Sequence, residues 1–227
     1  MNPELEDYLE QLAMEFKRSE NPDVASQQKA YMRGQFEYFG LKSPDRREVE
    51  KPFLIKEYLP SKVLIPELIR ALWNKPQRDF QMFGMDLLPK YQKSLAIEDL
   101  EMFEFMITHK SWWDTVDFIA VNLVGPYFKK YPKEIEKVIP KWMNDGNMWL
   151  QRTCIIFQLK NKSDLDTDLL ENIIHRSLGS QEFFINKAIG WVLREYGKTN
   201  PDWVVDFVNK NELSGLSQRE ALRIINK

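Results

Sequence analysis

Proline recurs at the start of successive amphipathic segments, and this recurrence constrains the fold more than any other feature of the chain. A proline is tolerated in the first turn of a helix, where its missing N–H is not needed, but disrupts a helix interior. Five dipeptides mark such starts: Ser43-Pro44, Ile65-Pro66, Lys75-Pro76, Tyr131-Pro132 and Asn200-Pro201. Patterns typical of strands are nearly absent. The sequence therefore predicts about twelve or thirteen helices joined by short connections.

A weak internal repeat links the helices of the second half. Four charged residues near helix starts recur at separations of 35, 35 and 32 residues: Asp117, Arg152, Lys187 and Arg219. Asp79 extends the series toward the N-terminus. Helix pairs with such a period are typical of an all-α solenoid of stacked antiparallel pairs of the HEAT kind, in which equivalent positions line up along one curved face. Because no Gly/Ser-rich linker interrupts the chain, we predict a single domain over residues 1–227 with these charges on its concave face. For each charge taken alone, the alternative is an ordinary solvated helix face.

Composition excludes several kinds of site. Cys154 is the only cysteine, so no internal disulfide can form, and with His109 and His175 as the only histidines no zinc-ligand spacing can be drawn. We therefore predict no metal site and no cofactor. The acidic N-terminus lacks the order of a signal peptide, and no apolar stretch of about eighteen residues occurs. These features lead us to expect a cytoplasmic protein with no membrane segment.

The formal net charge of −2 is unevenly distributed. Residues 1–24 hold seven acids and two bases, so the remainder of the chain carries a net charge of +3. A modest basic face that meets the phosphates of a nucleic acid is therefore compatible with the composition.

The segment 111–117 combines two indoles with two carboxylates. Ser111 and Asp114 have the spacing of a capping box, which predicts that they satisfy the free N–H groups of a helix start. Asp117 is left without such a structural role, and it lies one turn beyond Trp113 on the same helix face. An aromatic wall beside a carboxylate suits a planar, cationic substrate. The alternative is a core tryptophan beside a solvated aspartate.

Two further motifs accompany this pair, and together they resemble those of the AlkD family of bacterial DNA glycosylases. The three motifs are Ser-Trp-Trp-Asp-Thr-Val-Asp at 111–117, Trp-Leu-Gln-Arg at 149–152 and Phe-Phe-Ile-Asn-Lys-Ala-Ile-Gly-Trp at 183–191. The helical pattern is also similar over almost the whole chain. Proteins of that family are HEAT-like repeat proteins that remove alkylated bases from DNA.

The resemblance implies excision of cationic purines, such as 3-methyladenine and 7-methylguanine, from duplex DNA by a monofunctional glycosylase. It implies that Asp117 is the catalytic carboxylate, that Trp113 and Trp191 line the cleft around the lesion, and that Arg152 contacts a DNA phosphate. The residue chemistry agrees, because a carboxylate stabilises the oxocarbenium-like sugar formed when an N-glycosidic bond breaks.

Other residues are candidates for DNA contact. Four side chains are predicted to bind the backbone or close over it: Tyr31, Lys160, Lys187 and Arg194. Packing is the alternative for Tyr31, and favourable placement of a cation late in a helix is the alternative for Lys160 and Arg194. One of Phe183 and Phe184 is expected to pack inside, without an indication of which. Four other tryptophans are predicted to be core residues: Trp73, Trp112, Trp142 and Trp203.

The principal rival is a non-catalytic α-solenoid that binds DNA structures or a protein partner through its concave face. Repeat proteins are more often scaffolds than enzymes, and a fold does not determine a function. The presence of Trp113, Asp117, Arg152 and Trp191 together favours the enzyme. We therefore predict a monomeric DNA repair glycosylase whose partner is duplex DNA with alkylated bases.

Overall fold

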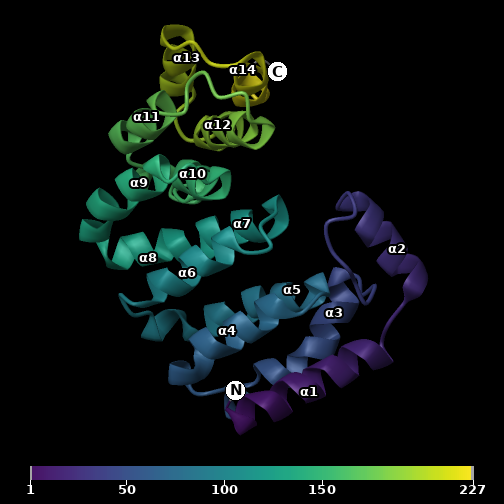
Figure 1. Ribbon diagram of the computed structural model, residues 1–227. Coiled ribbons are helices and arrows are strands. Elements are labelled where there is room, and N and C mark those ends of the chain that lie inside the picture. Colours follow the sequence, from purple (N-terminus) through teal and green to yellow (C-terminus); the bar gives the residue numbers. More distant parts are fainter. Residues whose placement is uncertain (1, 226–227) are drawn as a thin grey trace. The chain divides into compact units, whose positions relative to one another are not determined.

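The computed structural model describes residues 2–225, which are helical and contain no β-strand beyond one isolated bridge (Figure 1). The chain divides into two compact units, Met1–Met102 and Phe103–Lys227. The first unit contains α1 (Pro3–Arg18), α2 (Pro22–Tyr31), α3 (Ser43–Glu50), α4 (Ile65–Asn74) and α5 (Arg78–Leu87), and α6 (Asp99–Thr108) spans the boundary. The prediction of an all-α chain is confirmed, whereas the single domain over residues 1–227 stays a prediction.

The second unit is an α-solenoid segment. Helices α7 (Trp113–Ile119), α10 (Met148–Ile156), α12 (Phe183–Tyr196) and α14 (Gly215–Leu222) lie side by side in that order (Figure 1). A second row flanks them: α9 (Ile135–Asn144), α11 (Thr167–His175) and α13 (Pro201–Lys210). Buried apolar residues between the rows, such as Ile155, Ile189 and Leu193, form the core. Burial of these side chains supplies most of the stability of such a stack.

Helix α7 continues into a short π-helical segment. The segment Ala120–Val124 separates α7 from α8 (Gly125–Lys130), and Asn122 donates a hydrogen bond from its Nδ2 to the Phe118 carbonyl at 2.9 Å. A side chain on Gly125 would come within 2.7 Å of the Phe157 carbonyl oxygen, so this helix approaches the end of α10 closely. Local π-helical segments occur frequently at functional sites. The helical periodicity of the sequence does not predict this local widening.

The predicted capping box is wrong. Helix α7 begins at Trp113, and its N-cap residue, Trp112, makes no side-chain capping bond. The Ser111 hydroxyl instead donates to the Ile107 carbonyl at 2.6 Å, so it satisfies the end of α6. The helix starts one residue later than the box requires, and the serine hydroxyl is used by the preceding helix.

The predicted tryptophan core is correct for two residues of four. Trp73 and Trp142 are fully buried, whereas Trp112 and Trp203 are half-buried. Trp112 forms an aromatic cluster with Trp149 and Phe184, at centroid distances of 5.8 and 5.3 Å. Trp112 therefore packs behind the candidate site described below, and not in the centre of the core.

Gly190 permits the close contact between α12 and α14. A Cβ atom there would lie 2.5 Å from Cβ of Glu220 and 2.9 Å from the carbonyl oxygen of Ser217. The Ser217 hydroxyl donates to the Asn186 carbonyl at 2.8 Å, which holds the two backbones together. A side chain at this position can be accommodated only if α14 moves.

We expect Gly190→Ala to lower the free energy of unfolding by about 1–3 kcal/mol, the usual effect of overpacking a tight contact. Urea denaturation of the whole chain measures it. Gly215→Ala is the matched control, because the atom closest to its new methyl group is 3.4 Å away, at the end of the Arg219 side chain. The control should be neutral or slightly stabilising. Equal stability of wild type and Gly190→Ala would show that this contact is not tight.

Candidate active site

Three helices of the second unit place side chains around one cleft of about 270 Å³. Trp113 and Asp117 come from α7, Arg152 from α10 and Trp191 from α12. Other lining residues all come from the α12 region: Phe183, Phe184, Lys187 and Arg194. The predicted convergence of the first four residues is confirmed, and their roles stay predictions. The cleft forms because the stacked helices bring one position of each repeat to the same side.

Asp117 and Arg152 form a bidentate ion pair. Arg152 Nε lies 2.7 Å from Oδ1 of Asp117, and Nη2 lies 2.8 Å from Oδ2. The remaining guanidinium nitrogen, Nη1, donates to the Phe184 carbonyl at 2.5 Å. The side chain of Arg152 is 4% exposed and that of Asp117 is 16% exposed. Such a fork fixes the plane and the position of the carboxylate.

This geometry changes the interpretation of Arg152. The sequence predicts a cation that reaches a DNA phosphate, but the structure buries the guanidinium and directs each of its nitrogens to a protein acceptor. Its main partner, Asp117, lies one repeat earlier in the chain on another helix, so the sequence around Arg152 alone does not predict the pair. In this structure Arg152 is a positioning residue for Asp117, and its contact with phosphate stays a prediction.

Burial raises the pKa of Asp117 above its ordinary value. The hydrogen bonds and the positive charge of Arg152 act in the opposite direction and lower the pKa, whereas the negative charge of Asp114 adds to the rise. Desolvation of a carboxylate strengthens its interaction with any cation that enters the cleft. Arg152 thus offsets part of the penalty of burying an anion at this position.

Aromatic side chains surround the carboxylate. Trp113 and Trp191 are half-buried and line the cleft. Phe184 is the member of the Phe183–Phe184 pair that packs inside, where it lies 5.0 Å from the ring of Trp149. Phe183 is 56% exposed and lies at the rim. Ring faces beside an anion favour a bound cation.

The two cations that α12 contributes to the cleft share one acid. Lys187 lies 2.6 Å from Oε1 of Glu220 on α14, and Arg194 pairs with the other oxygen, Oε2. The hydrogen bond from Lys187 is the main reason that the pKa of Glu220 is lowered. Sequence reasoning missed Glu220, although Arg219 beside it stands in the repeat register. Lys187 and Arg194 lie two helical turns apart on α12, which places both on the face toward α14.

The other two predicted DNA-binding residues are not part of this cleft. Lys160 lies in the turn after α10, where its Nζ donates to Oδ1 of Asn122 at 2.8 Å, and it lines a neighbouring pocket. Tyr31 belongs to the first unit, at the end of α2, and is 71% exposed. For both residues DNA contact stays a prediction.

Within residues 2–225, no group of three or more His, Cys, Asp or Glu side chains could hold a metal ion. No helix in the same range has the length and apolarity needed to span a bilayer. Cys154 is buried, and its burial raises the pKa of the thiol. A buried, protonated thiol is a poor nucleophile.

Comparison with known proteins identifies a family and a similar solved structure. The family model described as "DNA alkylation repair enzyme" matches residues 12–225. A solved structure described as a predicted DNA alkylation repair enzyme from Enterococcus faecalis is 32% identical, with a TM-score of 0.85. The match covers 92% of this chain and 97% of that chain. No curated protein matches the sequence.

Proposed function

The chain belongs to the family of DNA alkylation repair enzymes, and we propose that it is a glycosylase that hydrolyses the N-glycosidic bond of cationic alkylated purines in duplex DNA. The observation that carries the proposal is the position of Asp117. Its carboxylate is held by a buried arginine at a cleft with two tryptophans, Trp113 and Trp191.

A single carboxylate is sufficient for this reaction. Alkylation at a purine ring nitrogen, as in 3-methyladenine or 7-methylguanine, makes the base cationic, so it leaves without protonation by a general acid. The bond between C1′ and the base nitrogen breaks, the base takes the electron pair, and positive charge develops on the deoxyribose. Asp117 stabilises that charge and orients the attacking water. Each carboxylate oxygen has a second lone pair beyond the one that accepts from Arg152.

The aromatic walls complete the site. Trp113 and Trp191 stack on the sugar and the cationic base, and each contact contributes about 0.5–2 kcal/mol depending on desolvation. Lys187 lies 2.6 Å from Oε1 of Glu220, so its nitrogen is held by a carboxylate and is not directed at the sugar as a Schiff-base nucleophile would be. This pairing supports monofunctional hydrolysis over lyase chemistry.

Incubation of the purified protein with methylated duplex DNA tests the proposal. We expect release of free 3-methyladenine or 7-methylguanine, detected by chromatography, together with abasic DNA that remains uncut until alkali is added. Strand cleavage without alkali would show lyase chemistry. Binding of the DNA without release of any base would support a non-catalytic solenoid that recognises DNA structure.

A further inference from the structure

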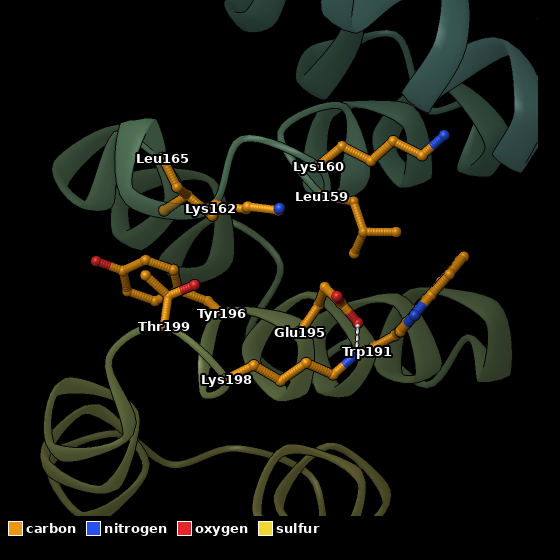
Figure 2. A pocket seen from close by; sticks show the side chains of 9 residues that line it. All are labelled: Leu159, Lys160, Lys162, Leu165, Trp191, Glu195, Tyr196, Lys198 and Thr199. Carbon is orange, nitrogen blue, oxygen red and sulfur yellow. Dashed lines mark hydrogen bonds and ion pairs between the residues drawn. The ribbon is translucent and has the colours of Figure 1, made fainter.

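A second pocket adjoins the candidate active site through Trp191. Its volume is about 650 Å³, and the indole of Trp191 lines both cavities. The remaining lining residues, all drawn in Figure 2, come from the turns after α10, from the end of α12 and from the turn that follows α12: Leu159, Lys160, Lys162, Leu165, Glu195, Tyr196, Lys198 and Thr199. A ligand that fills the first cleft can therefore extend past this indole into the second pocket.

The lining of this pocket is basic. Among the residues that the structure describes, its lining contains three lysines and only one acid, Glu195. Lys198 pairs with Glu195 at 2.6 Å, and Lys160 donates to a neutral acceptor, Oδ1 of Asn122. Lys162 makes no ion pair or hydrogen bond through its side chain with any other residue in 2–225. Figure 2 shows its ammonium directed from the rim across the pocket toward Leu159. Within the described part of the chain, Lys162 has no protein partner to give up, and Lys160 and Lys198 can exchange theirs for an anion, so the pocket is suited to a ligand with several negative charges.

The lysine is also held in an unusual backbone conformation. Lys162 has a φ angle of +52°, a left-handed conformation that is uncommon outside glycine. Lys162 is the first residue of a short 3₁₀ turn, Lys162–Asp164, which is closed by bonds from Asp164 N–H to the Asn161 carbonyl and from Leu165 N–H to the Lys162 carbonyl. The turn directs the side chain into the pocket and does not depend on a charged partner to do so.

From these contacts we infer that the pocket binds the phosphodiester backbone of the lesion strand, at nucleotides that directly follow or precede the excised base. The inference rests on the proposed function, since it assumes that the Asp117 cleft holds the lesion. Leu159 and the Tyr196 ring provide apolar wall for deoxyribose, and the lysines neutralise the phosphates. Lys162 makes the principal contact, and Lys198 exchanges Glu195 for phosphate.

Binding of Lys162→Ala to duplex DNA that holds a tetrahydrofuran abasic site tests this inference. Loss of one phosphate contact should make the slope of log affinity against log salt shallower by about 0.9, which corresponds to about fivefold weaker binding near 0.15 M salt. Alanine retains the Cβ atom, so the left-handed turn is not relaxed. Lys162→Glu should weaken binding further. Lys137→Ala, which removes an exposed lysine paired with Glu134 on another helix, is the control and should leave the slope unchanged.

Neutral backbone linkages identify the strand. Methylphosphonates beside the abasic site on the lesion strand should weaken binding of wild type but not of Lys162→Ala, because the contact is already absent. If the same linkages on the complementary strand produce this non-additivity, the pocket binds the other strand and the inference is wrong. Unchanged affinity and slope in Lys162→Ala would also overturn it, while base release by wild type would show that the proposed function stands. A salt-slope effect without any base release would keep the subsite and reject the glycosylase.

Discussion

Asp117→Asn is expected to slow base excision by about a hundredfold to a thousandfold. The substitution keeps the shape of the side chain but removes the negative charge that faces the developing sugar cation. Removal of one preorganised stabilising group in other active sites raises the barrier by about 2.7–4 kcal/mol, at about 1.4 kcal/mol for each tenfold loss of rate. Single-turnover release of 7-methylguanine at saturating enzyme measures the effect. Affinity for duplex DNA should hold or rise slightly, since a carboxylate repels phosphate.

The structure adds a loss of stability to this prediction. The sequence assigned the structural role to Asp114 and none to Asp117. The structure pairs Asp117 with the buried Arg152, so the neutral side chain of Asp117→Asn leaves the guanidinium without its counter-charge. Breaking such a pair typically lowers stability by about 3–5 kcal/mol, and the amide oxygen recovers part of it. Excision must therefore be compared well below the melting temperature. Asp114→Asn is the matched control, because Asp114 does not line the cleft. Full excision by folded Asp117→Asn would reject Asp117 as the catalytic carboxylate.

Arg152→Ala is expected to slow excision about a hundredfold at neutral pH, the scale of loss when a reacting group is misplaced. It should also move the pH profile. Burial already raises the pKa of Asp117, and Arg152 opposes that rise. Without the guanidinium the pKa rises further, so more of the carboxyl is protonated and inactive at neutral pH. Excision should therefore recover as the pH is increased, with its half-maximal point at higher pH than in wild type.

The free energy of unfolding should also depend on pH through protonation of the Asp117 carboxyl. A carboxyl whose pKa is higher in the folded state favours folding at low pH and loses that contribution as the pH rises toward the folded pKa. Removal of Arg152 raises the folded pKa of Asp117 further, so the destabilisation of Arg152→Ala relative to wild type should grow as the pH rises through the two folded pKa values and be largest, about 3–5 kcal/mol, above that of the variant. Arg152→Lys restores the charge and should move the pH profile back. A lower plateau with an unmoved profile, and a salt slope shallower by about 0.9, would instead indicate that Arg152 binds phosphate.

The sequence was most informative where one segment contains the whole signal. Prolines and helical periodicity predicted the helices, because a first turn tolerates proline whatever surrounds it. The register of Asp117, Arg152 and Lys187 predicted that they stand on neighbouring helices, since a solenoid repeats its geometry. Opposite charges one repeat apart, such as Asp117 and Arg152 at a separation of 35 residues, also indicate an ion pair between neighbouring helices.

What the sequence missed depends on contacts between helices. Glu220 holds Lys187 and Arg194, but nothing within residues 215–222 distinguishes it from a solvated acid. Ser111 has the local spacing of a capping box, yet the carbonyl of Ile107 competes for its hydroxyl. The partial exposure of Trp112 follows from its packing on Trp149 and Phe184, which belong to two other helices.

The π-helical segment Ala120–Val124 determines the rotational phase of the residues before it. Each residue of an α-helix advances the face by about 100°, so deletion of one residue from this segment would restore a regular helix and turn Asp117 by about that angle away from Arg152. Gly125 keeps the following helix against α10, so the rotation could not be absorbed there. The length of this segment is thus constrained even though none of its side chains lines the cleft. Shortening it by one residue would abolish the ion pair while leaving every residue of the site in the chain.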